Sequence, residues 1–163
     1  MFGVSAAATA WVGGALLLFA SLYFGLGWGL VLFQFPGALE STKPGGFSER
    51  FGRPVRTAVA FFTVWSLLMV VGGVILTIAE WDQGGYRWGP FVYTIATVVA
   101  TTFTVLLILP VNRVLYQEVP EPARFRALLS RWITLNIIRT VIWTVEWIAI
   151  ALWFVALAIK ARS

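Results

Sequence analysis

Residues 131–154 constrain this chain more than any other stretch, because they are apolar enough to cross a membrane and still carry polar groups. A membrane-spanning helix needs about 20 apolar residues to cross roughly 30 Å of hydrocarbon. Asn136, Arg139 and Glu146 interrupt this one. At about 3.6 residues per turn, these three side chains and Trp143 fall on one stripe of the helix.

A charged group near the centre of a membrane helix costs at least about 2.5 kcal/mol, so it is expected to face a protein interior and to serve a function. Arg139 can extend its long side chain back towards the lipid headgroups, whereas Glu146 lies near the middle of the stretch. The two residues are about 10 Å apart along the helix axis, and arginine leans towards the helix N-terminus. We therefore expect no ion pair between them, and Glu146 should find its partner on another helix.

The composition agrees with a membrane protein, because 60% of the 163 residues are hydrophobic and only 12% are charged. Soluble domains carry about 25% charged residues. The chain has no cysteine and no histidine, which excludes disulfides, thiolate chemistry and the usual ligands of zinc, copper, haem and iron–sulfur clusters. We expect no metal and no cofactor.

Four apolar runs predict an all-α protein, a single-domain integral membrane four-helix bundle. The expected spans are residues 8–35, 57–79, 90–109 and 133–159, with Pro36 ending the first and Pro110 ending the third. Residues 122–131 alternate arginine with apolar side chains, which predicts a short amphipathic interfacial helix before the last span.

Small residues in the first span indicate how it packs. Ser21, Gly25 and Gly29 recur every four residues, and small residues at this spacing let two membrane helices approach closely. We expect this ridge to contact a neighbouring helix.

The distribution of basic residues predicts the orientation in the membrane. Eight of the twelve lie in the two longer loops, residues 36–56 and 110–131: Lys43, Arg50, Arg53, Arg56, Arg113, Arg124, Arg126 and Arg131. By the positive-inside rule, both loops are cytoplasmic and both termini lie outside, in a plasma (inner) membrane. The net charge of +5 is explained by anionic headgroups, so the bilayer is the expected partner and nucleic acid is not.

Three short motifs point to a family. They are Phe35-Pro36 after the first span, the P-x-N-R turn at Pro110, Asn112 and Arg113, and the W-x-x-x-N-x-x-R pattern at Trp132, Asn136 and Arg139. In these motifs and in its four-span layout, the chain resembles the anthrone-oxygenase-like family of small membrane proteins. The resemblance implies a four-helix bundle and, from the few named members, oxidation of a polycyclic phenolic anthrone to a quinone by O₂ without a bound metal.

The first functional hypothesis is a bundle that binds or oxidises a hydrophobic aromatic small molecule. Oxygenation without a cofactor needs a base that forms a carbanion and a cation or amide that stabilises the oxyanion. Glu146 fits the first role, and Arg139 with Asn136 fits the second. Further candidates for ligand binding are Trp143, Thr97, Thr101, Asn112 and Arg113. Thr94, Thr97, Thr101 and Thr104 share one face of the third span, which either lies opposite Glu146 or bonds to its own backbone.

The second hypothesis is a non-catalytic accessory or assembly subunit, either a homo-oligomer or part of a larger membrane complex. Glu146 is then protonated and bonded to a threonine or tryptophan, because a satisfied buried polar group can fix helix register without catalysis. Transport is disfavoured, since the four spans lack the broken helices and internal repeats of transporters. A cavity touching Glu146 and Arg139 would favour the ligand hypothesis, and solid packing there would favour the structural one.

Overall fold

A computed structural model describes residues 6–44, 46–47, 51, 53–117, 119 and 121–160 of the chain, so Arg50 of the first basic loop lies outside the described residues. Its regular elements are all helical: α1 (Ala6–Gly29) with a π-helical turn (Leu30–Gln34), α2 (Ala38–Ser41), α3 (Arg53–Glu80), a 3₁₀ turn (Gly84–Arg87), α4 (Trp88–Phe103), a second π-helical turn (Thr104–Ile108), α5 (Leu109–Tyr116) and α6 (Pro122–Lys160).

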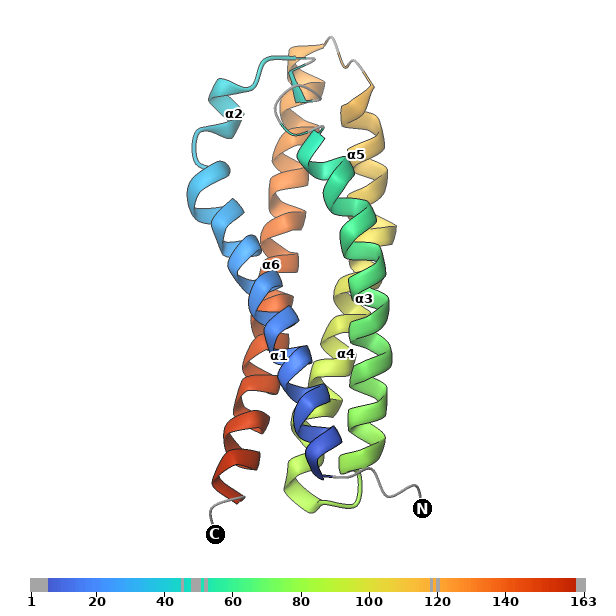
Figure 1. Ribbon diagram of the computed structural model, residues 1–163. Coiled ribbons are helices and arrows are strands. Elements are labelled where there is room, and N and C mark those ends of the chain that lie inside the picture. Colours follow the sequence, from blue (N-terminus) through green and yellow to red (C-terminus); the bar gives the residue numbers. More distant parts are fainter. Residues whose placement is uncertain are drawn as a thin grey trace.

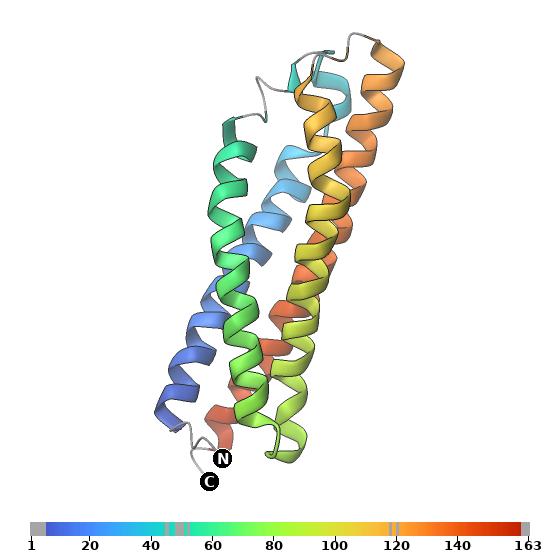
Figure 2. The ribbon, with the colours of Figure 1, turned by 90° about the vertical axis from the view of Figure 1, so that its right-hand side faces the viewer.

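The long helices run side by side in an elongated bundle (Figure 1). α1 begins and α6 ends at one end of the bundle, called here the terminal end, and α2 and α5 lie at the opposite loop end (Figures 1 and 2). Four helical segments are long and apolar enough to cross a membrane: Ala7–Gln34, Phe61–Glu80, Gly84–Tyr116 and Pro122–Lys160. The predicted all-α membrane bundle is confirmed.

The third span continues past Pro110, where the sequence predicted its end. Proline lacks a backbone N–H, and its ring clashes with the carbonyl four residues earlier. Here the preceding turn, Thr104–Ile108, is π-helical, and α5 follows it without a break. A π turn changes the hydrogen-bond spacing locally, so the helix passes the proline instead of stopping. Much of the predicted loop at residues 110–131 is therefore helical.

Residues 122–131 are helical as predicted, but they do not form a separate interfacial helix. They belong to α6, which runs without interruption for 39 residues from Pro122 to Lys160. Phe125, Leu129 and Trp132 are buried in protein and stand in register with the buried face of the span. The buried residues lie on one continuous face along the whole helix. The first part of α6 therefore continues in the direction of the span and does not lie in the plane of the membrane.

The predicted packing ridge is wrong at Gly25 and Gly29, whereas Ser21 does contact a neighbouring helix, because its Oγ accepts a hydrogen bond from Trp147 Nε1 of α6 at 3.0 Å. A Cβ placed on Gly25 or Gly29 would meet no atom within 4 Å. α1 instead approaches α6 closely at Gly13, where a Cβ would strike the Trp153 ring, and at Gly27, whose Cβ would lie 2.9 Å from Thr140 Oγ1 and 3.0 Å from the Trp143 ring. Gly25 and Gly29 face open space instead of a neighbouring helix.

Candidate functional site

A cavity of about 570 Å³ lies inside the loop-end half of the bundle, between α1, α3, α4 and α6. Seven of the eight residues predicted as catalytic or ligand-binding line it: Thr97, Thr101, Asn112, Asn136, Arg139, Trp143 and Glu146. Arg113 does not line it, because this side chain is exposed on the last turn of α5. The cavity touches both Glu146 and Arg139, which is the arrangement that favours a ligand over solid packing.

α6 supplies the polar wall because its functional side chains recur every three or four residues. Trp132, Asn136, Arg139, Trp143 and Glu146 therefore project from one face. Four of the five are buried, and Arg139 is partly buried. One face of one helix thus presents an amide, a guanidinium and a carboxyl to the same space.

A chain of hydrogen bonds runs from α5 to the guanidinium of Arg139. Asn112 Oδ1 accepts a hydrogen bond from the indole N–H of Trp132, and Asn136 Nδ2 donates to the Trp132 carbonyl at 2.8 Å. Asn136 Oδ1 then accepts a hydrogen bond from Arg139 Nη2 at 2.6 Å. Asn112 of the P-x-N-R turn and the three residues of the W-x-x-x-N-x-x-R pattern therefore join in a single network that orients the arginine.

Arg139 has no carboxylate partner among the described side chains. Its guanidinium lies over the Trp143 ring, 4.4 Å from the centroid, and its Nε atom is buried without a hydrogen-bond partner. Arginine stays charged in proteins and carries five N–H donors. A tryptophan face attracts this charge but does not neutralise it. The charge and the remaining N–H donors of Arg139 are therefore available to bind an anionic group or a strong hydrogen-bond acceptor.

Glu146 is only 1% exposed, and neither carboxyl oxygen has a hydrogen-bond partner within the described part of the chain. Thr97 is its neighbour on α4, but the Thr97 hydroxyl donates to the Tyr93 carbonyl at 2.9 Å. Thr97 belongs to the threonine face that the sequence offered as the source of a partner, so the expected neighbour is present but its hydroxyl proton is directed to its own helix. An unpartnered buried carboxyl is costly, so this group is either neutral or meets a molecule in the cavity.

The threonine face of α4 largely bonds to its own helix. Thr94, Thr97 and Thr104 each donate to the carbonyl four residues earlier, at 2.8–2.9 Å. This is the backbone-bonded alternative considered from the sequence. Thr97, Thr101 and Thr104 still line the cavity, so they give that wall weakly polar surface.

Sequence reasoning missed Tyr23 as a member of the site. Its hydroxyl lies 3.1 Å from Ser66 Oγ and 3.2 Å from the Phe62 carbonyl, and its ring packs edge-on against Trp143 at 5.0 Å. Tyr23, Phe62 and Ser66 all line the cavity. The sequence does show a tyrosine within an apolar span. Because a buried phenol usually has a hydrogen-bond partner, this residue could have been predicted to pair with a polar group on another helix.

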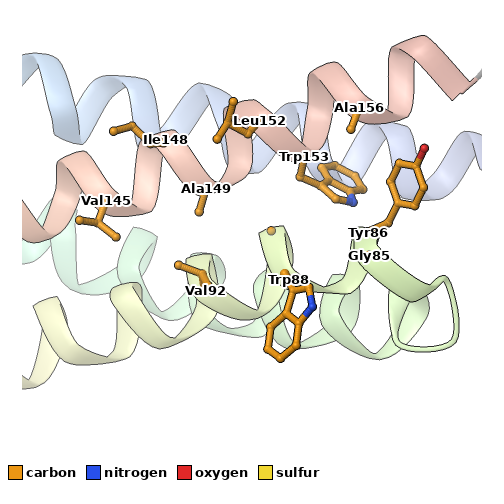
Figure 3. Close-up of a pocket in the computed structure, with 11 residues that line it drawn as sticks. Gly85, Tyr86, Trp88, Val92, Val145, Ile148, Ala149, Leu152, Trp153 and Ala156 are labelled. Carbon is orange, nitrogen blue, oxygen red and sulfur yellow. The ribbon is translucent and has the colours of Figure 1, made fainter.

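A second hollow of about 620 Å³ lies between α4 and α6 near the terminal end (Figure 3). Aliphatic and aromatic side chains line it, including Val92, Ile148, Leu152 and Trp153. No charged residue takes part. This hollow offers apolar contact but no charged group that could bind or activate a ligand. The cavity around Arg139 and Glu146 is therefore the candidate site.

Within the described ranges, no three acidic side chains gather in a way that could hold a metal ion.

Comparison of the chain with protein families, curated proteins and solved structures found no match to any of them.

Proposed function

We propose that the cavity binds a flat, apolar aromatic molecule with a hydrogen-bonding oxygen, and that the protein oxidises this molecule with O₂ without a bound metal. One observation carries the proposal. A guanidinium without a carboxylate partner and a carboxyl without a hydrogen-bond partner face the same cavity from one helix. A ligand that bonds to both would relieve the cost of leaving each unpaired in the membrane.

The shape and walls of the cavity suit such a ligand. A volume of about 570 Å³ falls in the ordinary range of small-molecule sites, roughly 300–1,000 Å³. The rings of Tyr23, Phe62 and Trp143 offer aromatic contact, and Arg139 can donate to a ligand oxygen. Arg139 and Glu146 are about 10 Å apart along α6, a distance that a fused-ring molecule can bridge.

The two groups divide the chemistry between them. Glu146 as a carboxylate removes a proton from an activated CH₂ group, and Arg139 stabilises the negative charge that spreads onto the ligand oxygen. The carbanion carbon then bonds to O₂, the resulting peroxide takes up a proton, and loss of water leaves a carbonyl. The balance is CH₂ + O₂ → C=O + H₂O, as in the reaction that the family resemblance implies.

Binding and catalysis can be tested separately in lipid nanodiscs. Energy transfer from tryptophan to 1-hydroxypyrene should saturate at one probe per chain, and pyrene, which lacks the hydroxyl, should bind more weakly. With anthrone as substrate and chelator present, one O₂ should be consumed per quinone formed. Non-saturating transfer would refute the binding site, and binding without O₂ uptake would refute the oxidation.

We further infer that the loop end faces the cytoplasm and that the terminal end lies outside. The exposed residues Lys43, Arg113, Arg124, Arg126 and Arg131 all belong to the loop-end segments. Cytoplasmic enrichment of Lys and Arg is the usual determinant of orientation in an inner membrane.

A further inference from the structure

We infer that the ligand enters the cavity sideways from the bilayer, through a gap between α1 and α3 bordered by Gly25 and Gly29. The inference rests on the proposed function and adds the physical class of the ligand: an uncharged, lipophilic molecule already dissolved in the membrane. It follows from where the cavity is closed and where it is open.

Packed aromatic side chains close the cavity towards the loop end. Phe47 is fully buried, and Phe51 and Trp132 are nearly so. Their rings pack together with centroids 5.2–5.4 Å apart, and the apolar cluster that contains them also includes Phe125 and Leu129. A ligand that approached along the bundle axis from the loop end would therefore have to displace packed aromatic side chains.

A second packed layer closes the cavity towards the terminal end. Tyr23 bridges α1 and α3 there through its bonds to Ser66 and Phe62, and its ring packs on Trp143. Met69 and Tyr93, which belong to the same apolar cluster, are fully buried. Passage along the bundle axis is therefore blocked on this side as well.

The exposed residues that line the cavity lie on α1, α3 and the third span, on the lateral surface of the bundle. On α6, all lining residues are buried except the partly buried Arg139. By contrast, α1 and the turn after it contribute the exposed residues Gly25, Leu26, Phe33 and Gln34, and α3 contributes Val59 and Thr63. Phe33 is 82% exposed although it also borders the cavity. On the third span, Val105 is the exposed member.

The gap exists because α1 changes partners along its length. On α3 the described side chains are Val59 and those from Phe61 onwards, and their hydrogen bonds and ring contacts with α1 reach no further towards the loop end than Tyr23. Beyond it, α1 is held by α6: Gly27 packs against Thr140, and Trp28 Nε1 donates to Thr144 Oγ1 at 3.0 Å. The ribbons of α1 and α3 accordingly separate towards the loop end (Figure 1).

Gly25 and Gly29 set the width of this gap. Within the described part of the chain, neither has an atom within 4 Å of where a Cβ would stand, so larger side chains at these positions would occupy the opening without striking a described neighbour. The exposed side chains around the gap are apolar (Leu26, Phe33 and Val59) or polar without charge (Gln34 and Thr63), so no ionic group there offsets the desolvation of a charged molecule. An apolar aromatic molecule that partitions into hydrocarbon would cross the gap without this desolvation cost.

Stopped-flow mixing of vesicles loaded with 1-hydroxypyrene and vesicles containing the protein tests this route through tryptophan-to-probe energy transfer. In the Gly25→Leu/Gly29→Leu double variant, association and dissociation should both slow about tenfold, with little change in Kd, because a narrower opening raises the barrier in both directions. Ala15→Leu adds a leucine at an exposed position on the terminal half of α1 and should leave both rates unchanged.

Phe33→Ala should have the opposite effect and speed both rates, which keeps the test valid if the double variant fails to fold. Unchanged rates in both the double variant and Phe33→Ala, with saturable binding to the wild-type protein, would overturn the lateral route alone. Absence of saturable binding to the wild-type protein would overturn the proposed function, and the route with it.

Discussion

Replacing Arg139 by glutamine separates a functional arginine from a structural one. Glutamine retains an amide that can still donate to Asn136 Oδ1, but it removes the positive charge and most of the five N–H donors. The variant also loses the cation–π contact with Trp143, in which the guanidinium lies 4.4 Å from the ring centroid. The change therefore acts on the charge that the cavity presents to a ligand.

The two expected effects differ in size. In the ligand-free protein, losing the cation–π contact costs about 0.5–2 kcal/mol. Removing a charge that has no counter-ion stabilises the membrane-inserted chain by about 2.5–3.5 kcal/mol on insertion scales. The unfolded, membrane-inserted state gains part of this energy too, so only the remainder adds to the stability of the folded state. The stability should thus stay within about 1–2 kcal/mol of wild type. Losing a charge-assisted hydrogen bond to the ligand costs about 1.5–3 kcal/mol, or roughly ten- to hundredfold in Kd.

The assay measures the Kd of 1-hydroxypyrene by energy transfer and the stability by denaturant titration in detergent. Arg113→Gln is the matched control, because Arg113 is exposed and lies outside the cavity. It should leave both quantities unchanged. A wild-type Kd in the Arg139→Gln variant would refute the argument that this guanidinium binds the ligand, and a large stability loss with unchanged Kd would assign it a structural role.

Three further outcomes are expected. Gly27→Ala should lower the unfolding free energy by about 1–3 kcal/mol, because the added methyl group overpacks the contact with α6. Gly25→Ala should raise the unfolding free energy by up to about 1 kcal/mol, because alanine has the higher helix propensity. Equal effects in a denaturant titration would contradict the packing described above. Glu146→Gln should fold and still bind 1-hydroxypyrene but lose O₂ uptake, since an amide cannot accept the proton; retained uptake would remove Glu146 from catalysis. In this cysteine-free chain, Ser130→Cys should be protected from a membrane-impermeant thiol reagent added outside, and Asp82→Cys should react. The reverse pattern would invert the proposed orientation.

The sequence was sufficient to predict the membrane bundle and most of the candidate site. Hydropathy located the four spans because a bilayer requires continuous apolar helices. Polar residues on such a helix must face inward, and their spacing therefore placed Asn136, Arg139 and Glu146 on one wall. Helix geometry alone places them on one face, and the structure shows that this face borders a cavity.

The predictions that failed depended on relations between helices. A ridge of small residues shows that close approach is possible, but it does not identify the face that a neighbour covers. Gly27 packs against α6, while Gly25 and Gly29 remain open. Similarly, Pro110 ends a regular α-helix, but the sequence does not show that a π-helical turn will accommodate it. Tyr23 gained its role from Ser66 and Phe62 on another helix, a pairing that spacing within one span does not reveal.

The same partner relations explain why the cavity can coexist with a stable bundle. Along the terminal half, α1 reaches α3 through Tyr23, and the core between them is filled. Towards the loop end, α6 holds α1 through Gly27 and the Trp28–Thr144 hydrogen bond, so α1 needs no contact with α3 to stay in place. The cavity that remains between α1, α3, α4 and α6 is lined by the guanidinium of Arg139 and the carboxyl of Glu146. Filling this space with protein would satisfy packing but leave no room for a ligand to meet Arg139 and Glu146.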